Sequence, residues 1–294
     1  MKKTKQILSA LLALVMLLSL GAAAFADNTQ SRTVIGADLN DEQVQAVYNM
    51  FGKTRGSVIE LTMTNAEERA YLEGFVDPSI IGTRSISCVY VELLPAGSGM
   101  DVRTSNITWC TGEMYVSALA TAGITDAHII VAAPFAVSGT AALSGIYKAY
   151  EDMTGQKLDA NAKLVSTQEL TITGELANEI GSMDSTAIVN ELKLILDETK
   201  NMSDDEIRYE IGQIAAQYGV SLTEAQVSQL ITLCRSLEGL DSNSLKQRVE
   251  EVQNTLKKVQ ETQTKVVGFV NTIKNAADTV TSFISKLKGI FGLE

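Results

Sequence analysis

Short β-rich runs alternate with helical stretches between residues 32 and 155, and this alternation constrains the fold more than any other feature of the sequence. The expected strands are 33–37, 57–64, 85–94, 100–107 and 128–133, and the expected helices are 40–51, 65–74, 112–122 and 139–150. The run at 129–133 has no polar alternation, which is typical of a central strand covered on both faces. The pattern therefore predicts an α/β N-terminal domain, a mixed sheet with flanking helices, over residues 27–155.

The order of these runs also indicates how the strands connect. The runs 85–94 and 100–107 flank the turn-forming segment Pro95-Ala96-Gly97-Ser98-Gly99, which predicts a hairpin. The elements that follow predict a βαβα unit over residues 100–150. If the sheet is parallel there, the loops after the strands 100–107 and 128–133 lie at one edge of the sheet.

These two loops carry the residues that we nominate as a ligand-binding site. They are Thr108, Trp109 and Thr111 in the first loop and Ser138, Gly139 and Thr140 in the second. Each loop follows a strand and opens a helix, which is where α/β folds present backbone N–H groups to anions or other ligands. Capping of the second helix by Ser138 or Thr140 is the structural alternative.

Catalytic and metal-binding chemistry finds little support in the sequence. His128 is the only histidine, and about 20 Å of extended chain, at roughly 3.3 Å per residue, separates it from Ser138, so a Ser–His pair is not expected. One histidine and three scattered cysteines offer no ligand spacing for a transition metal. The acidic segment 202–206 has residue types that bind calcium, but it is better explained as a helix cap. We predict neither a metal nor a cofactor.

The three cysteines, Cys88, Cys110 and Cys234, are an odd number, which argues against a disulfide framework. Cys88 and Cys110 lie in neighbouring predicted elements, so a disulfide between them is one alternative. The other is that all three are small buried hydrophobic residues.

Residues 156–240 show no convincing strand and are expected to form a helical domain. Capping signals at 203–206 and 223–226 each precede apolar residues at helical spacing. The residues expected to face the core are Ile207, Ile211, Ile214, Tyr218, Val227, Leu230, Ile231 and Cys234.

Residues 241–294 carry a heptad pattern from Leu245 to Phe291, in which only Gln263 is polar. The pattern predicts a long C-terminal amphipathic helix, or a hairpin of two helices hinged near Gly268. Beyond the hinge the apolar face widens and the remaining residues are mostly basic, as in helices that lie on a membrane surface. Three roles stay open for residues 245–291: packing on the same chain, self-association, and contact with a membrane surface.

The first 26 residues have the three parts of a secretory signal peptide. Lysines open the segment, an apolar run covers 7–20, and Ala24-Phe25-Ala26 precedes the cleavage point. The apolar run is shorter than the roughly 20 residues that a membrane-spanning helix needs. We therefore predict a secreted, extracytoplasmic protein that is cleaved after Ala26. The formal net charge of the full chain, −11, disfavours nucleic acid as a partner, because phosphate backbones bind basic surfaces.

Several blocks of the sequence resemble a known family. They are 85–90 (Ser-Ile-Ser-Cys-Val-Tyr), 106–108 (Asn-Ile-Thr), 114–115, 118–124, 132–135 (Ala-Ala-Pro-Phe) and 137–143. In this order they are similar to the YpuA-like family of secreted Firmicute proteins, a domain of unknown function numbered 1002, over about residues 30–235. The resemblance implies a Gram-positive, extracytoplasmic setting with a link to the cell envelope, and it implies no known activity or catalytic residues. Cys88 stands where the family leads us to expect a serine, which makes a disulfide less plausible.

These observations favour a non-catalytic, envelope-associated protein that binds a ligand or a cell-wall component, or acts as a scaffold. Two alternatives stay open: an extracytoplasmic hydrolase that acts on wall polymers or peptides, and a protein that binds membrane surfaces through its C-terminal helix. The acids Glu60, Glu92 and Glu113 lie near predicted strands, but nothing in their spacing identifies a catalytic pair.

Overall fold

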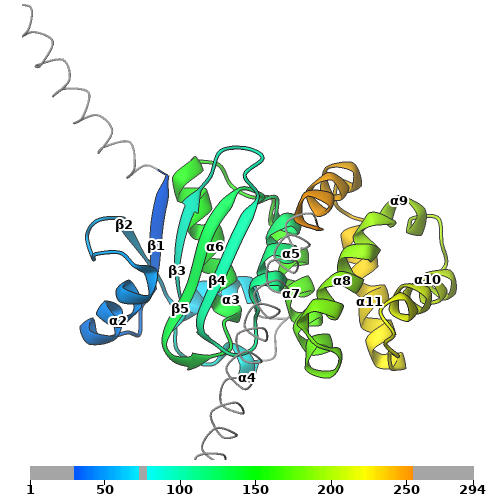
Figure 1. Cartoon of the computed structure of the whole chain (residues 1–294), viewed down its shortest axis with the longest axis horizontal. Helices are drawn as coiled ribbons and strands as arrows, with labels where there is room; N and C mark the ends of the chain where they lie inside the picture. Colours follow the sequence, from blue (N-terminus) through cyan, green and yellow to red (C-terminus); the bar gives the residue numbers. More distant parts are fainter. Residues whose placement is uncertain (1–29, 73–77, 254–294) are drawn as a thin grey trace, which may run out of the picture. The chain divides into compact units, whose positions relative to one another are not determined.

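The computed structural model describes residues 30–72 and 78–253, and of these the residues from 30 to 72 and from 78 to 252 belong to one compact unit (Figure 1). In these ranges the sheet has five strands in the order β2-β1-β3-β5-β4. They are β1 (Ser31–Gly36), β2 (Ile59–Met63), β3 (Cys88–Leu93), β4 (Met100–Ile107) and β5 (Ala127–Val137). The outer pairs are parallel, whereas β3 is antiparallel to both of its neighbours. The predicted mixed sheet is confirmed, and the domain boundary near residue 155 stays a prediction.

The predicted hairpin between 85–94 and 100–107 is wrong. Strand β5 lies between β3 and β4, antiparallel to the first and parallel to the second. Ile129 and Val131 of β5 are completely buried, and a hairpin would leave this apolar strand at an edge of the sheet, beside water. Burial of the apolar run therefore outweighs the turn signal in deciding which strands pair.

Helices cover both faces of the sheet. The helices of this part of the chain are α2 (Asp41–Phe51), α3 (Asn65–Leu72), α4 (Pro78–Ile81), α5 (Gly112–Ala122) and α6 (Thr140–Thr154), of which α2, α5 and α6 pack on strands. On α6, a Cβ added to Gly145 would lie 3.3 Å from Val89 and 3.7 Å from Val34. Helix α2 shares a core cluster with Ile35 and Tyr90, the next residues along the same strands. Because successive side chains of a strand point to opposite faces, α2 and α6 cover opposite faces of the sheet.

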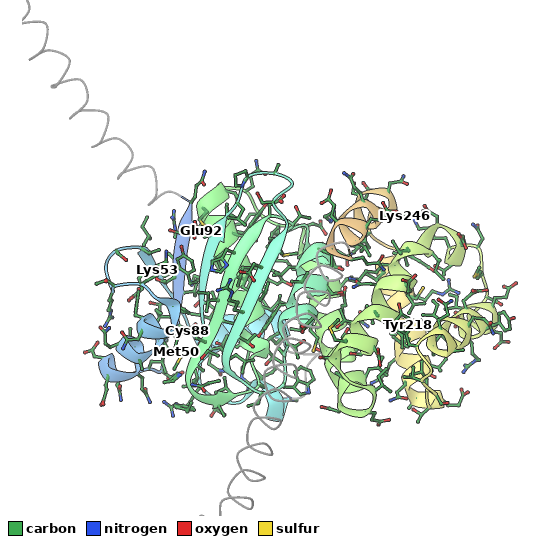
Figure 2. All side chains as sticks on the ribbon, in the orientation of Figure 1. Met50, Lys53, Cys88, Glu92, Tyr218 and Lys246 are labelled. Carbon is green, nitrogen blue, oxygen red and sulfur yellow. The ribbon has the colours of Figure 1, made fainter. Side chains whose placement is uncertain are left out.

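The cysteines are all free and buried. The disulfide between Cys88 and Cys110 is therefore wrong, and the alternative of small buried residues is confirmed. Cys88 belongs to the core cluster on the α2 side of the sheet, against which Met50 packs (Figure 2). Burial raises the pKa of the Cys88 and Cys110 thiols to about 12, so neither is a thiolate at neutral pH.

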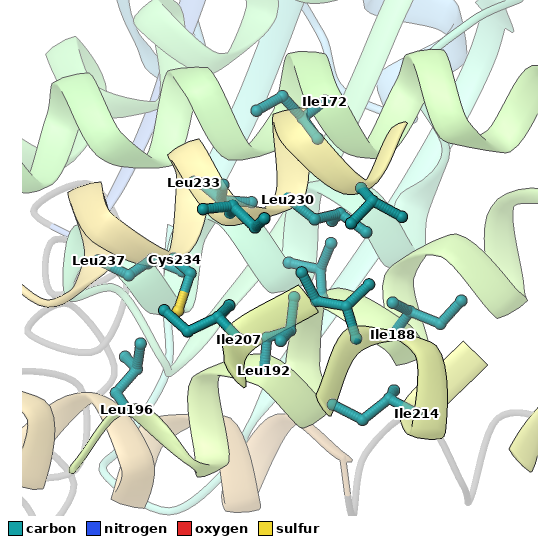
Figure 3. Packing of buried hydrophobic residues seen from close by; sticks show 14 of the residues in the cluster. Ile172, Ile188, Leu192, Leu196, Ile207, Ile214, Leu230, Leu233, Cys234 and Leu237 are labelled. Atoms are coloured by element: carbon teal, nitrogen blue, oxygen red, sulfur yellow. The ribbon is translucent and has the colours of Figure 1, made fainter. Parts of the chain in front are cut away.

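The predicted helical region is confirmed. Its helices are α7 (Ala160–Ile180), α8 (Ser182–Leu194), α9 (Leu196–Thr199), α10 (Asp204–Gln217) and α11 (Glu224–Leu237). The side chains of Ser203 and Thr223 cap α10 and α11, each within a complete capping box. The expected apolar residues meet in one core, in which Ile207, Leu230 and Cys234 are fully buried (Figure 3).

The first turns of the heptad pattern pack against this core. Leu245 and Val249 are completely buried within it, and Arg248 Nε donates to the carbonyl of Ala120 at the end of α5 at 2.7 Å. The heptad positions beyond Val252 and the predicted signal peptide lie outside the described residues, so the long helix, its three alternative roles and the cleavage site stay predictions. Within 30–72 and 78–253, no helix combines the length and the apolar character needed to cross a membrane.

A buried ion pair joins α5 of the sheet layer to α7 and α8. Lys193 Nζ donates to Glu169 Oε1 at 2.6 Å, and the two side chains are 0% and 1% exposed. The ammonium also donates to the carbonyl of Ser117 at 3.0 Å and to Asn190 Oδ1 at 3.2 Å, while Thr121 Oγ1 donates to Glu169 Oε2 at 2.5 Å. Because buried charges need such partners, the network fixes how α7 and α8 pack on α5.

Trp109 lies in the loop after β4 and contacts α7 at Gly174. A Cβ added to Gly174 would lie 2.5 Å from Cζ2 of the indole. We expect Gly174→Ala to lower the free energy of unfolding by about 1–3 kcal/mol, because a rigid ring cannot give way to the new methyl group. Urea denaturation measures the change.

Gly212→Ala in α10 is the matched control for this prediction. Gly212 is an exposed helical glycine, and nothing lies within 4 Å of an added Cβ. This substitution is expected to raise the free energy of unfolding by about 0.5–1 kcal/mol, because alanine favours helix more than glycine does. Equal effects of the two substitutions would contradict the contact between Trp109 and Gly174.

Candidate functional site

The loops after β4 and β5 meet at the carboxyl edge of the sheet, because these two strands are parallel. Backbone hydrogen bonds tie the loops together: Thr108 N donates to Val137 O at 2.9 Å, and Cys110 N donates to Ser138 O at 3.1 Å. The expectation that the two loops share one edge is confirmed.

An irregularity in the β4–β5 pairing shapes this edge. The register shifts between Ser105 and Ile107. Asn106 has a left-handed backbone with φ 58°, and its Nδ2 donates to the carbonyl of Ala133 at 2.8 Å. Asparagine tolerates this conformation better than most residues. The bulge leaves Phe135 43% exposed, beside the loops.

Two of the six nominated residues have clear structural roles in the first loop. Thr111 is the N-cap of α5, and its side chain accepts a hydrogen bond from Met114 N. Trp109 rests on Gly174 of α7, as described above. Thr108 is exposed, and its hydroxyl donates to Val137 O at 3.0 Å.

Gly139 is required by packing at the start of α6. It has φ 96°, and an added Cβ would lie 2.4 Å from Ile107 Cγ2 and 2.7 Å from Tyr115 Oη. The Tyr115 hydroxyl donates to the Gly139 carbonyl at 2.5 Å. Only glycine fits a left-handed position with so little space around it.

The remaining two nominated residues, Ser138 and Thr140, line a cavity of about 270 Å³. The other residues that line it are Ile81, Gly82, Thr83, Arg84, Ile86, Ser87, Val137 and Ala141. The N-cap residue of α6 is Gly139, which has no side chain to cap the helix, and the alternative of helix capping by Ser138 or Thr140 stays open. The first N–H groups of this helix have no intrahelical partner, and they add partial positive charge at the cavity.

Arg84 supplies a full positive charge to the same cavity. Its Nη2 donates to the Asp38 carbonyl at 2.9 Å, and it forms no ion pair within the described ranges. Ser87 is 8% exposed, and its hydroxyl has no hydrogen-bond partner in the part of the chain that the structure describes. A guanidinium, hydroxyl donors and a helix N-terminus together suit an oxyanion.

Arg84 and Ser87 were not among the predicted site residues. The predicted residues lie in loops that follow strands, whereas Arg84 and Ser87 precede β3. The direction of β3 was the available signal, because a strand antiparallel to β4 begins at the edge where β4 ends.

Glu68 of α3 contacts Ser85, the residue that follows Arg84. Its carboxylate is completely buried and accepts a hydrogen bond from the Ser85 hydroxyl. Burial raises the pKa of Glu68 to about 7, and the nearby carboxylates of Asp38 and Glu67 add to this effect. An acid with this pKa titrates near neutral pH.

His128 does not take part in the carboxyl-edge cavity. Its Nδ1 lies 2.9 Å from Asp101 Oδ2 on the neighbouring strand, and its ring packs edge-on against Tyr90. In residues 30–72 and 78–253 no group of three or more His, Cys, Asp or Glu side chains has the arrangement of a metal site.

These features define a mixed α/β protein with a helical extension and a polar cavity at the carboxyl edge of its sheet. The chain belongs to the family described as protein of unknown function (DUF1002), whose model matches residues 35–259. It is 36% identical to the uncharacterized protein YpuA of Bacillus subtilis (strain 168) over 236 residues, which cover 79% of this chain and 80% of the relative. No solved structure matches the chain. The resemblance seen in the sequence blocks is confirmed.

Proposed function

We propose that this protein is a non-catalytic, extracytoplasmic binding protein that holds an oxyanion of a cell-envelope component, a phosphate or a carboxylate, in the carboxyl-edge cavity. One observation carries the proposal: Arg84, which has no ion-pair partner among the described residues, lines the same cavity as the partnerless hydroxyl of Ser87. The guanidinium of Arg84 donates one hydrogen bond to the Asp38 carbonyl and has further N–H groups to offer a ligand, and arginine is the side chain best suited to bind a phosphate or a carboxylate.

The setting of the proposal comes from the sequence. The signal-peptide pattern in the first 26 residues supports export, and an exported chain meets envelope polymers and peptides that carry phosphate and carboxylate groups. The net negative charge of the chain supports a local anion site rather than a broad cationic surface.

The test is a titration of residues 27–294 with inorganic phosphate and, separately, with acetate, followed by NMR. Binding of at least one oxyanion is expected, with resonances of Ser87 and Thr140 among those that shift. Arg84→Gln is expected to weaken it at least about tenfold, because the charge-assisted hydrogen bonds are lost. The two anions distinguish a phosphate site from a carboxylate site.

Arg103→Gln is the matched control, since it removes the same charge from β4. Arg103 is 69% exposed and pairs with Asp101, so its loss is expected to leave binding unchanged. If both substitutions weakened anion binding equally, the loss would be an effect of net charge rather than of a site at Arg84. If neither anion bound saturably, the proposed site would be wrong. Pull-downs on purified wall, with and without its phosphate-bearing polymers, then test the envelope component.

A further inference from the structure

A second cavity, of about 580 Å³, lies between the edge strand β2, helix α3 and helix α6. Its size is in the range of small-molecule binding sites. The residues that line it are Leu61, Met63, Glu67, Ala70, Tyr71, Lys148, Glu151, Asp152, Gly155 and Lys157. We call it the β2 cleft. It combines an apolar surface with charges of both signs.

Two ion pairs place an ammonium group next to a carboxylate in the β2 cleft. Lys148 Nζ lies 2.6 Å from Glu67 Oε1, and Lys157 Nζ lies 2.7 Å from Glu151 Oε2. Glu151 also pairs with Lys163 at 2.7 Å, so it keeps a cation if Lys157 moves. Ion pairs with one exposed partner contribute little to stability, so a ligand can exchange partners with them at little cost.

Asp152 and Tyr71 complete the β2 cleft. Asp152 Oδ2 accepts a hydrogen bond from Arg32 Nε at 2.6 Å, and its side chain is 43% exposed, which leaves it accessible to a ligand. The ring of Tyr71 is held from two sides, since Lys163 Nζ lies 5.1 Å from its centroid and Tyr147 packs edge-on against it. The ring is therefore a fixed apolar wall.

We infer that the β2 cleft binds a zwitterionic ligand with an apolar side chain, that is, an amino acid or a short peptide with free ends. The ligand carboxylate pairs with the ammonium of Lys148 or Lys157, and the ligand ammonium pairs with Glu67 or Asp152. Its side chain contacts Tyr71 and the neighbouring apolar residues. A ligand with a single charge would leave one member of an opened ion pair without a partner, so a zwitterion is favoured.

The test compares three probes on the full chain by NMR titration: the dipeptide leucyl-alanine, its N-acetyl form, which has no ammonium, and its amide, which has no carboxylate. Saturable binding of the free dipeptide is expected, and each blocked form is expected to bind at least about tenfold more weakly. Equal binding of all three probes, or no saturation up to about 20 mM dipeptide, would overturn the inference.

Variants locate the binding. Lys148→Met is expected to weaken dipeptide binding at least about tenfold. Lys157→Gln is a second variant of the β2 cleft, and because the Lys157 side chain is 84% exposed, this substitution leaves the fold intact. Lys246→Gln is the control, since it removes an exposed lysine that does not line the β2 cleft (Figure 2). This variant is expected to bind the dipeptide as the wild type does. The result is independent of the carboxyl-edge cavity, because Arg84→Gln is expected to leave dipeptide binding unchanged. A loss that is equal in all the lysine variants would overturn the assignment.

Discussion

Replacing Lys193 with methionine is expected to lower the free energy of unfolding by about 3–5 kcal/mol, because it leaves the carboxylate of Glu169 buried without a cation. Both side chains are at most 1% exposed, and the ammonium bonds to groups on α5, α7 and α8. Burial lowers the pKa of Lys193 and the adjacent Glu169 carboxylate raises it, with burial the larger effect. Urea denaturation at pH 7 measures the loss.

Two further variants define the cause of that loss. Arg208→Met removes an exposed partner of Glu224 from α10 and is expected to cost less than about 1 kcal/mol. The double variant Lys193→Met with Glu169→Gln is expected to be more stable than Lys193→Met alone, since it no longer buries an unpaired charge. If the second substitution destabilised the protein further, loss of packing rather than of charge pairing would be the cause.

Glu68→Gln is expected to stabilise the protein at pH 8 and to leave its stability at pH 4.5 almost unchanged. Burial raises the pKa of Glu68 to about 7 in the folded state, whereas the unfolded chain titrates near 4.3. Between these values the folded state binds more protons, so this group makes stability fall as pH rises. The contribution levels off above about pH 7, at a total on the order of 3 kcal/mol. The difference in unfolding free energy between the two proteins, measured from pH 4.5 to 8, isolates the group.

The neighbouring residue provides a control with the opposite sign. The ammonium of Lys148 and bonds from Thr64 lower the pKa of Glu67, so this carboxylate stabilises the folded state above its unfolded pKa and loses that effect as pH falls. Glu67→Gln is therefore expected to destabilise the protein at pH 8, and less so in acid. A difference between wild type and Glu68→Gln that did not change with pH would contradict the titration of Glu68.

Local patterns predicted the elements well, because caps and apolar spacing act over a few residues. The bounds of α5, 112–122, and the capping boxes that begin α10 and α11 agree with the sequence analysis. Strand order depends on contacts between distant residues. The Pro95–Gly99 segment has the composition of a hairpin turn. Its residues carry no information about the later strand β5, which takes the position between β3 and β4 in the sheet.

The candidate site divides in the same way. The positions of Ser138 and Thr140 were predictable, because the two strands β4 and β5 run parallel and the loops that follow them must lie at the same edge of the sheet. The contact of Trp109 with Gly174 joins residues from separate regions of the sequence, so it could not be predicted from either loop. The β2 cleft was missed for the same reason, since Lys148 and Glu67 are 81 positions apart in the sequence.

The place of β1 inside the sheet has a consequence for the time course of folding. Its two partners, β2 and β3, come later in the chain, and β3 in turn needs β5, which ends at Val137. When the chain is synthesised from its amino end, the backbone N–H and C=O groups on one side of β1 therefore have no partner strand until more than fifty further residues have been added. Pairings over such separations carry a high loop-closure entropy, which places this sheet among slowly folding topologies. During that interval the unpaired side of β1 can form hydrogen bonds with other chains. A chaperone that binds the nascent chain would therefore favour the correct sheet.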